Sequence, residues 1–433
     1  MLYHSTTTPS HRVDLKEAIL RSLPPDNGLY MPDALPVLSS DFWAIWRDLE
    51  FQEVAYAAAH AFFQEDVPAA ALKDMVEGTL TFEVPLVCLS PGDHILELFH
   101  GPTLAFKDFG ARFMARLMAW LVRGESRELT VLVATSGDTG GAVASAFHQV
   151  PGTRVIILYP EGKVSGLQEK QLTTLGDNIS ALEIAGTFDD CQRLVKSAFL
   201  DRELSERLNL TSANSINLAR LVPQSFYYLE ATRQLPEGVD PTFAIPSGNF
   251  GNLTAGLLAV QLGLPVKQFI AATNINDVVP AYLKSGTYEP RPSTATISNA
   301  MDVGAPSNFA RMQALFGNSW EAMRQKIVGY RISDDETRAA IREVKSLHDY
   351  ELDPHGAVAW IAARRWRAAN PTHPTIVLET AHPAKFLDVM EHELGKGVVE
   401  IPERLAILAH REKVAAKLAP DEAAFKEWLL GNR

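Results

Sequence analysis

The sequence predicts an α/β protein of the doubly wound class with a small helical domain at its N-terminus. Three observations predict this organisation. From about residue 129, short runs rich in β-branched residues alternate with helical patterns. A glycine-containing turn or an amphipathic stretch follows each run. The first 95 or so residues read differently, as a proline-rich entry followed by helical stretches. Strands that alternate with helices favour parallel sheets covered on both faces, with ligands beyond the carboxyl ends of the strands.

The individual elements follow from this pattern. Helical stretches are predicted in the N-terminal part for "FQEVAYAAAHAFFQED" and "PAAALKDMVEG". The predicted strands are "LTVLVAT", "TRVIILY", "ALEIAG", "TFAIPS", "KQFIAATN" and "PTIVLET". Farther along, "DDETRAAIREVKSLHDY" and "PHGAVAWIAARRWRAAN" predict amphipathic helices. We find no internal repeat and no low-complexity segment.

Composition excludes several classes of protein. The chain has 433 residues, of which 46% are hydrophobic and 21% charged, so it is long enough for two or three domains of ordinary globular composition. A formal net charge of −12 argues against nucleic-acid and membrane partners. Cys88 and Cys191 provide neither a disulfide framework nor a metal cluster. With no secretion signal in the first residues, we expect a cytoplasmic protein without a metal.

Two glycine-rich turns stand between a predicted strand and a predicted helix. "TSGDTGGAVASAF" follows the run "LTVLVA", and "PSGNFGNLTAGLLA" follows "TFAI". Backbone N–H groups at such helix starts favour bound anions, for example phosphate or carboxylate. Neither turn matches the dinucleotide fingerprint or the P-loop, and a glycine turn at this place is more often only structural.

Lys107 opens a strongly patterned helix in "HGPTLAFKDFGARFMARLMAW". One interpretation is a solvated lysine lying over its phenylalanine neighbours. The alternative follows from its position, because a helix N-terminus and the apolar flanks Phe106 and Phe109 both disfavour the ammonium. A neutral lysine amine is a nucleophile that forms Schiff bases. This alternative requires that the carboxylate of Asp108 point away from the amine.

Eight motifs then resemble one family, in the family's order. They are "ELFHGPTLAFKDFG", "TSGDTGGAVA", "LYPEGKVSGLQEKQ", "NSINLARL", "IPSGNFGNLTAGLLA", "FIAATNINDVVP", "SNAMDVGAPSNF" and "TAHPAKF". The sequence resembles the threonine synthases, within the fold-type II enzymes that use pyridoxal phosphate. The resemblance runs from "DNGLYMP" to at least Phe386. It implies a helical domain over residues 1–95 and a catalytic region over 96–433, in which a small parallel-sheet subdomain, about 125–225, is inserted in a large one.

The resemblance assigns residues to the cofactor, pyridoxal 5′-phosphate. Lys107 matches the lysine that forms the Schiff base and moves protons. Thr380 matches the hydroxyl that faces the pyridine nitrogen. Asp138 stands where many relatives have asparagine. Its carboxylate can bind the cofactor's 3′-oxygen only if the two oxygens share one proton. The second glycine turn matches the loop that holds the cofactor phosphate, through Gly248, Asn249, Phe250, Gly251 and Asn252.

The substrate residues are assigned in the same way. Ser136 and Thr139, in the first glycine turn, match the cradle for the substrate carboxylate. Ser215 and Arg220 match the contacts to a substrate phosphate, and arginine suits phosphate because it binds two oxygens at once. Lys163 either adds positive charge at this substrate-phosphate site or is a solvated surface lysine. His382 and His100 are interpreted as structural. The implied substrate is O-phospho-L-homoserine, and a monomer is favoured over an obligate oligomer.

The implied reaction is a β,γ-replacement that converts O-phospho-L-homoserine and water to L-threonine and phosphate. The alternative is a phospho-lyase of the same fold that releases a 2-oxo acid, ammonia and phosphate. A third hypothesis is a non-catalytic homologue that binds pyridoxal phosphate or a phospho-amino acid as a sensor. A hydrolase or nucleotide-binding protein stands last, because the corresponding motifs are absent from the sequence.

Overall fold

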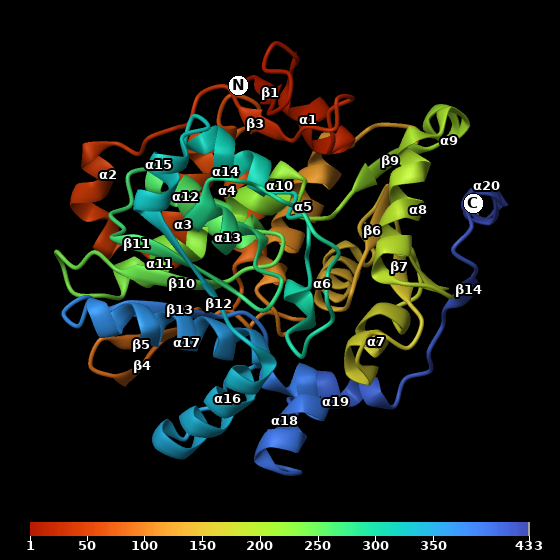
Figure 1. The fold of residues 1–433 in the computed structure, drawn as a ribbon. Coiled ribbons are helices and arrows are strands. Elements are labelled where there is room, and N and C mark those ends of the chain that lie inside the picture. Colours follow the sequence, from red (N-terminus) through yellow and green to blue (C-terminus); the bar gives the residue numbers. More distant parts are fainter. Residues whose placement is uncertain (432–433) are drawn as a thin grey trace.

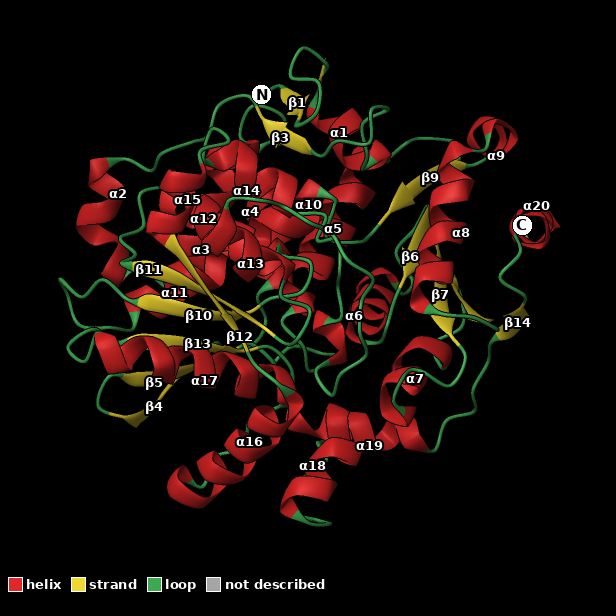
Figure 2. Ribbon diagram, viewed as in Figure 1, coloured by secondary structure: helices red, strands yellow, loops and turns green. Residues whose placement is uncertain are grey.

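The computed structural model describes residues 1–431 and contains three sheets (Figure 1). A small antiparallel sheet lies near the N-terminus, a six-stranded sheet forms the centre of the larger body, and a five-stranded sheet lies to its right in the figure. Helices surround the two larger sheets (Figure 2). The predicted α/β class with parallel sheets is confirmed. No helix within residues 1–431 combines the length and apolar character needed to cross a membrane.

The N-terminal part contains helices, as predicted, and in addition a short antiparallel sheet. The sheet has the order β2-β1-β3. Its strands are β1 (Tyr3–Ser5), β2 (Arg12–Val13) and β3 (Tyr30–Pro32), and the helices are α1 (Leu15–Arg21), α2 (Ser40–Ile45), η1 (Trp46–Asp48), α3 (Phe51–Phe63) and α4 (Ala69–Thr79). The strands are two or three residues long, too short for an alternating pattern to reveal them.

The large sheet has the order β12-β11-β10-β13-β5-β4. All neighbours run parallel except β4, which is antiparallel to β5 at the edge. Its strands are β4 (Leu86–Ser90), β5 (Asp93–Glu97), β10 (Thr242–Pro246), β11 (Gln268–Thr273), β12 (Ile327–Arg331) and β13 (Thr375–Glu379). This sheet therefore begins ahead of the boundary placed near residue 95.

The small sheet is entirely parallel, in the order β14-β8-β7-β6-β9. Its strands are β6 (Leu129–Ala134), β7 (Thr153–Pro160), β8 (Ile179–Ile184), β9 (Asn209–Ser212) and β14 (Ala416–Leu418). Four of them lie between β5 and β10 in the chain, within the range expected for an inserted subdomain. The fifth, β14, comes from the C-terminal part and pairs with β8.

Sixteen further helices and three short 3-10 turns complete the described chain. They are α5 (Lys107–Leu121), α6 (Asp138–Phe147), α7 (Gly166–Thr173), α8 (Phe188–Leu200), α9 (Arg202–Arg207), α10 (Leu218–Leu221), η2 (Val222–Ser225), α11 (Phe226–Arg233), α12 (Gly251–Gln261), α13 (Val278–Ser285), η3 (Asn299–Met301), α14 (Phe309–Leu315), α15 (Trp320–Lys326), α16 (Asp334–His348), α17 (Pro354–Ala369), η4 (Pro383–Phe386), α18 (Leu387–Leu394), α19 (Glu403–Ala409) and α20 (Glu422–Gly431).

Both faces of the central strands of the large sheet are buried, which is why β10, β11 and β13 read as continuous apolar runs. In β10, Phe243 and Ile245 belong to the core that contains α12, whereas Ala244 between them belongs to the core that contains α17. The central strands of the small sheet are also buried on both faces. In β6, Val131 and Val133 belong to the core that contains α12, whereas Leu132 belongs to a separate core that contains α8. α5 and α6 pack against each other between the two sheets (Figure 1).

Arg311 on α14 ties the N-terminal part to the catalytic region. Its side chain is fully buried and donates hydrogen bonds to the carbonyl oxygens of Tyr30, Ser215 and Ile216 and to Oδ1 of Asn308. Burial lowers the pKa of Arg311 to about 9. The guanidinium therefore holds three segments of the chain through acceptors that would otherwise be buried without donors.

We predict that Arg311→Met lowers the free energy of unfolding by at least about 3 kcal/mol, because it leaves several buried carbonyl oxygens without a donor. Chemical denaturation followed by circular dichroism measures this change. The matched control is Arg202→Met, which removes an arginine whose side chain is 92% exposed and pairs with Glu206 on the same helix. That control should change stability by less than about 0.5 kcal/mol. Equal effects of the two substitutions would contradict the role given to Arg311.

Candidate active site

Lys107 begins α5 beside the end of β13. Residues 104–106 run antiparallel to residues 380–382, with a bridge between Ala105 and Ala381. The N–H of Phe106 donates to the carbonyl oxygen of Thr380 at 2.9 Å, and the N–H of His382 donates to that of Leu104 at 3.0 Å. These contacts bring Thr380 to the start of α5, although it lies far along the chain.

The amine of Lys107 lies in a largely water-free position. Its side chain is 15% exposed, and Nζ lies 5.0 Å from the centre of the Phe106 ring. Burial lowers the pKa of Lys107; Lys385 and Arg220 lower it further, whereas Asp138 and Asp353 oppose the shift. The solvated interpretation of this lysine is therefore not supported by its surroundings.

Asp108 points away from the amine, as the nucleophile interpretation requires. Its carboxylate accepts hydrogen bonds from the N–H of Thr103 at 2.8 Å and from the hydroxyl of Thr103 at 2.7 Å. Burial raises the pKa of Asp108, and the Thr103 donors oppose this. The carboxylate thus holds residues 103–106, which we call the approach loop, against the N-terminus of α5.

Asp138 begins α6 and forms the ion pairs of this site. Its Oδ1 lies 2.7 Å from Nζ of Lys385 and accepts a hydrogen bond from Nε2 of Gln168, also at 2.7 Å. Its Oδ2 lies 3.9 Å from Nζ of Lys107. Burial alone raises the pKa of Asp138, but the two ammonium groups and Gln168 hold it well below its usual range. Asp138 is therefore a carboxylate in this structure.

The first glycine turn is folded by Thr135. Its hydroxyl oxygen accepts hydrogen bonds from the N–H groups of Gly137 at 3.0 Å and Gly140 at 2.9 Å. Gly137 has a φ of 144°, and a Cβ there would lie 2.8 Å from the amide of Gln168. Glycine is required for both reasons. Ser136 and Thr139 are half-buried at the start of α6, on the turn predicted to hold a carboxylate.

The second glycine turn leads into α12 through Phe250, whose φ of 59° is unusual for a bulky residue. Asn249 closes the turn: its Nδ2 donates to the hydroxyl oxygen of Ser215 at 2.7 Å, and its Oδ1 accepts from the N–H of Ser307 at 2.5 Å. Gly248 admits the main chain of residues 300–301, since a Cβ there would lie 2.7 Å from the oxygen of Ala300. Ser215 thus lies beside the predicted cofactor-phosphate turn.

Two buried donors near these turns have no acceptor within residues 1–431. They are Nδ2 of Asn252 and Nε of Arg220. The Oδ1 of Asn252 accepts from the hydroxyl groups of Tyr227 at 2.7 Å and Tyr228 at 2.6 Å, which leaves its amide nitrogen free. The N–H groups of Gly251, Asn252 and Leu253 have no intrahelical acceptor, as in the first turn of any helix. This end of α12 therefore suits an anion.

Arg220 lies close to α5 rather than on the surface. It is buried, and its Nη1 donates to the oxygen of Ala213 at 2.6 Å. Its Nε lies beside Gly110, where an added Cβ would be 3.0 Å from that nitrogen. Burial lowers the pKa of Arg220 to about 10, with Asp108 opposing. Lys163, in contrast, is exposed in the turn between β7 and α7. The structure brings Arg220 to the start of α5 and places Lys163 on the surface.

Sequence reasoning missed Lys385, Gln168 and Asp353. Lys385 follows Thr380 within the motif "TAHPAKF", so its position in that motif was the available signal. Asp353 caps α17 and also accepts a hydrogen bond from the N–H of Ala381 at 3.1 Å, which supports the turn after Thr380. The histidine assigned a structural role, His382, caps η4 by accepting from the N–H of Ala384.

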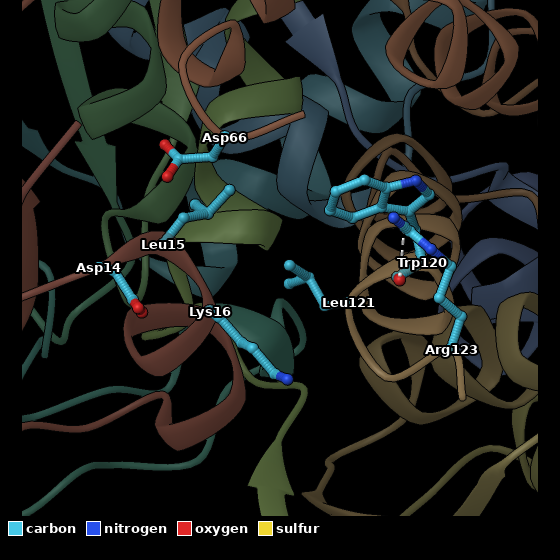
Figure 3. A pocket seen from close by; sticks show the side chains of 7 residues that line it. All are labelled: Asp14, Leu15, Lys16, Asp66, Trp120, Leu121 and Arg123. Atoms are coloured by element: carbon cyan, nitrogen blue, oxygen red, sulfur yellow. Dashed lines mark hydrogen bonds between the residues drawn. The ribbon is translucent and has the colours of Figure 1, made fainter. Parts of the chain in front are cut away.

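A surface hollow of about 280 Å³ at the other end of α5 is a different feature. It is lined by Asp14, Leu15, Lys16, Asp66, Trp120, Leu121 and Arg123 (Figure 3). Because α5 has 15 residues, at about 1.5 Å per residue the hollow lies roughly 20 Å from Lys107. Arg123 stacks on the ring of Trp120, and the hollow holds none of the predicted site residues. It is therefore not the candidate active site.

Three family models match the chain. The model described as a pyridoxal-phosphate dependent enzyme matches residues 96–379 and contains both glycine turns and Lys107. The model for the threonine synthase N terminus matches residues 2–80. The model for the C-terminal part of threonine synthase matches residues 356–429.

Full-length relatives and solved structures agree with the family models. The chain is 44% identical to threonine synthase of Escherichia coli K12, over 98% of each chain, and 36% identical to that of Saccharomyces cerevisiae, over 91% of this chain and 89% of the other. The crystal structure of Escherichia coli threonine synthase matches with a TM-score of 0.94 at 42% identity, over all of both chains. A structure of threonine synthase with bound pyridoxal phosphate, from Brucella melitensis, matches with a TM-score of 0.91 at 37% identity, over 99% of this chain and 98% of that one. The chain therefore belongs to the threonine synthase family of fold-type II pyridoxal phosphate-dependent enzymes.

Proposed function

We propose that the chain converts O-phospho-L-homoserine and water to L-threonine and phosphate, with the cofactor attached to Lys107. The observation that carries this proposal is the desolvated amine of Lys107, which lies 3.9 Å from the carboxylate of Asp138 in the first glycine turn. We also propose that it acts in the cytoplasm as a monomer. Two unpaired cysteines support the cytoplasmic location, and the resemblance to the threonine synthases is the basis for the monomer.

The residues of the site fit pyridoxal phosphate. When bound, this cofactor supplies an electron sink for charge that develops on substrate carbon atoms. Lys107 would hold it covalently, and the N-terminus of α12 with the free amide nitrogen of Asn252 would hold its phosphate. Thr380 would face the pyridine nitrogen. Because Asp138 is a carboxylate that already accepts from Lys385 and Gln168, it would offer the cofactor an acceptor oxygen.

The substrate would bind through its two anionic ends. Its carboxylate would lie on the turn of Ser136 and Thr139, where the start of α6 supplies N–H groups. Its phosphate would meet Arg220, whose Nε lacks an acceptor, with Ser215 as a further contact. Lys107 Nζ would then remove the Cα proton and return protons during the later steps, which requires an amine that titrates near neutral pH.

We predict that Lys107→Ala abolishes both turnover and the visible absorbance of lysine-bound pyridoxal phosphate, because the other amine beside the start of α5, Nζ of Lys385, is already held by Asp138 and the oxygen of Thr103. Phosphate release and absorbance spectra measure the two effects. Lys73→Ala, which removes an exposed lysine on α4, should retain both. A Lys107→Ala enzyme with full activity would overturn the assignment.

We predict that Arg220→Met lowers kcat/KM for O-phospho-L-homoserine by about 100-fold or more, because a guanidinium that binds two phosphate oxygens is lost. Arg220→Lys keeps the positive charge but not the two parallel N–H donors of the guanidinium, so its kcat/KM should fall less. Steady-state phosphate release gives the rates, and thermal melting of each variant separates binding from folding. Unchanged kcat/KM in a folded Arg220→Met variant would move the phosphate site elsewhere.

The reaction itself is tested by NMR analysis of the products formed from O-phospho-L-homoserine. We expect threonine and phosphate in equal amounts. 2-Oxobutyrate as the main product would assign the chain to the phospho-lyases of this fold. No release of phosphate from this compound would contradict the substrate assignment.

A further inference from the structure

Two buried lysines share one buried carboxylate beside the start of α5. Nζ of Lys385 lies 2.7 Å from Oδ1 of Asp138, and Nζ of Lys107 lies 3.9 Å from Oδ2. The side chains of Lys385, Asp138 and Lys107 are 0%, 5% and 15% exposed. Three ionisable groups therefore lie almost without water, and one negative charge faces two amines.

Lys385 is much better held than Lys107. Its Nζ also donates to the oxygen of Thr103 at 2.8 Å, and its own main-chain oxygen accepts from the hydroxyl of Ser165 at 3.1 Å. Gln168 donates to the same Oδ1 of Asp138 that Lys385 contacts. Short charge-assisted hydrogen bonds at fixed positions are the strong ones, so Asp138 and Lys385 form the stable ion pair of this site.

Because one carboxylate does not neutralise two buried ammonium groups, the less favourable one loses its proton. Lys107 is that group on geometric grounds: its Nζ is farther from Asp138 than that of Lys385, and it lies over the apolar ring of Phe106. Other charges face it from three elements, namely Lys385 on η4 and Arg220 on α10, which disfavour the ammonium, and Asp353 at the start of α17, which favours it.

We propose that Lys385 is a positioning residue that occupies the charge of Asp138 and thereby keeps the amine of Lys107 neutral and nucleophilic at the pH of catalysis. Without Lys385, the nearest cationic partner of Asp138 is Lys107, and the pair would hold Lys107 as an unreactive ammonium. The direction of the shift in the pKa of Lys107, which burial lowers, agrees with this arrangement. The inference rests on the proposed role of Lys107 as the cofactor lysine.

The test measures the reactivity of Lys107 itself. Full-length protein freed of cofactor is labelled with a trace of acetic anhydride at values from about pH 6 to about pH 11, and the peptide that contains Lys107 is quantified by mass spectrometry. Only the neutral amine reacts. In Lys385→Met, labelling of Lys107 near neutral pH should fall about tenfold, because an opposite charge at this range shifts a pKa by one unit or more. Lys73→Met should match the wild type.

Asp138→Asn provides the opposing variant, because it is nearly isosteric and removes the charge that favours the ammonium. Labelling of Lys107 should rise at low pH, whereas a general loosening of the site would move both variants in the same direction. Unchanged labelling in Lys385→Met, or shifts of one sign in both variants, would overturn the inference. Thermal melting identifies a variant that fails to fold. If one of the two variants does not fold, the direction in which labelling of Lys107 changes in the other variant decides the inference.

The loaded enzyme supplies an independent readout. The acidic limb of its kcat profile should lie at higher pH in Lys385→Met than in the wild type, and an unmoved limb would count against the inference. Because the labelled protein is free of cofactor, labelling reports the charge arrangement independently of whether Lys107 is the cofactor lysine. A fully active Lys107→Ala enzyme would therefore end the proposed function without deciding the role of Lys385.

Discussion

The burial of one amine is the constraint on which the rest of this structure depends. Lys107 loses most of its water at the start of α5, and a charged lysine in that position costs free energy that only specific neighbours reduce. The approach loop is held against residues 380–382, so the amine has little freedom to reach bulk solvent. The ion pair of Asp138 and Lys385 then decides how much negative charge the amine receives. A nucleophilic lysine in this fold is thus a property of three separate segments.

The proposed anion binding has a different physical source, namely the N–H groups at helix starts that lack an intrahelical acceptor. α6 and α12 each follow a buried parallel strand, and their first turns lie beyond the carboxyl ends of those strands. The two turns reach this geometry differently, since Thr135 ties the first with its hydroxyl and Asn249 ties the second with its amide. Two such turns suit the proposed assignments, with the substrate carboxylate at the first turn and the cofactor phosphate at the second.

The N-terminal part is connected to the second glycine turn by buried hydrogen bonds. Arg311 donates to Tyr30 in β3 and also to Ser215, which accepts a hydrogen bond from Asn249 in the second turn. A buried guanidinium with carbonyl acceptors is stable only while all of these segments stay in place. Movement of the N-terminal part would therefore disturb the second glycine turn, which gives this helical region a structural connection to the candidate site.

By itself, the sequence determined the α/β alternation, the two glycine turns and the unusual position of Lys107, because each of these depends on residues that are close together in the chain. Short strands escaped it, since β1 to β3 are too brief for a pattern, and so did the pairing of β14 with β8. Only the tertiary structure placed Ser215 beside Asn249, left Lys163 on the surface and brought Lys385 to Asp138. The hydrogen bond from Lys385 to Thr103 joins residues 282 positions apart. Local patterns report hydrophobic periodicity and turn chemistry, whereas the sharing of one charge between two distant amines depends on distances that exist only in the folded chain.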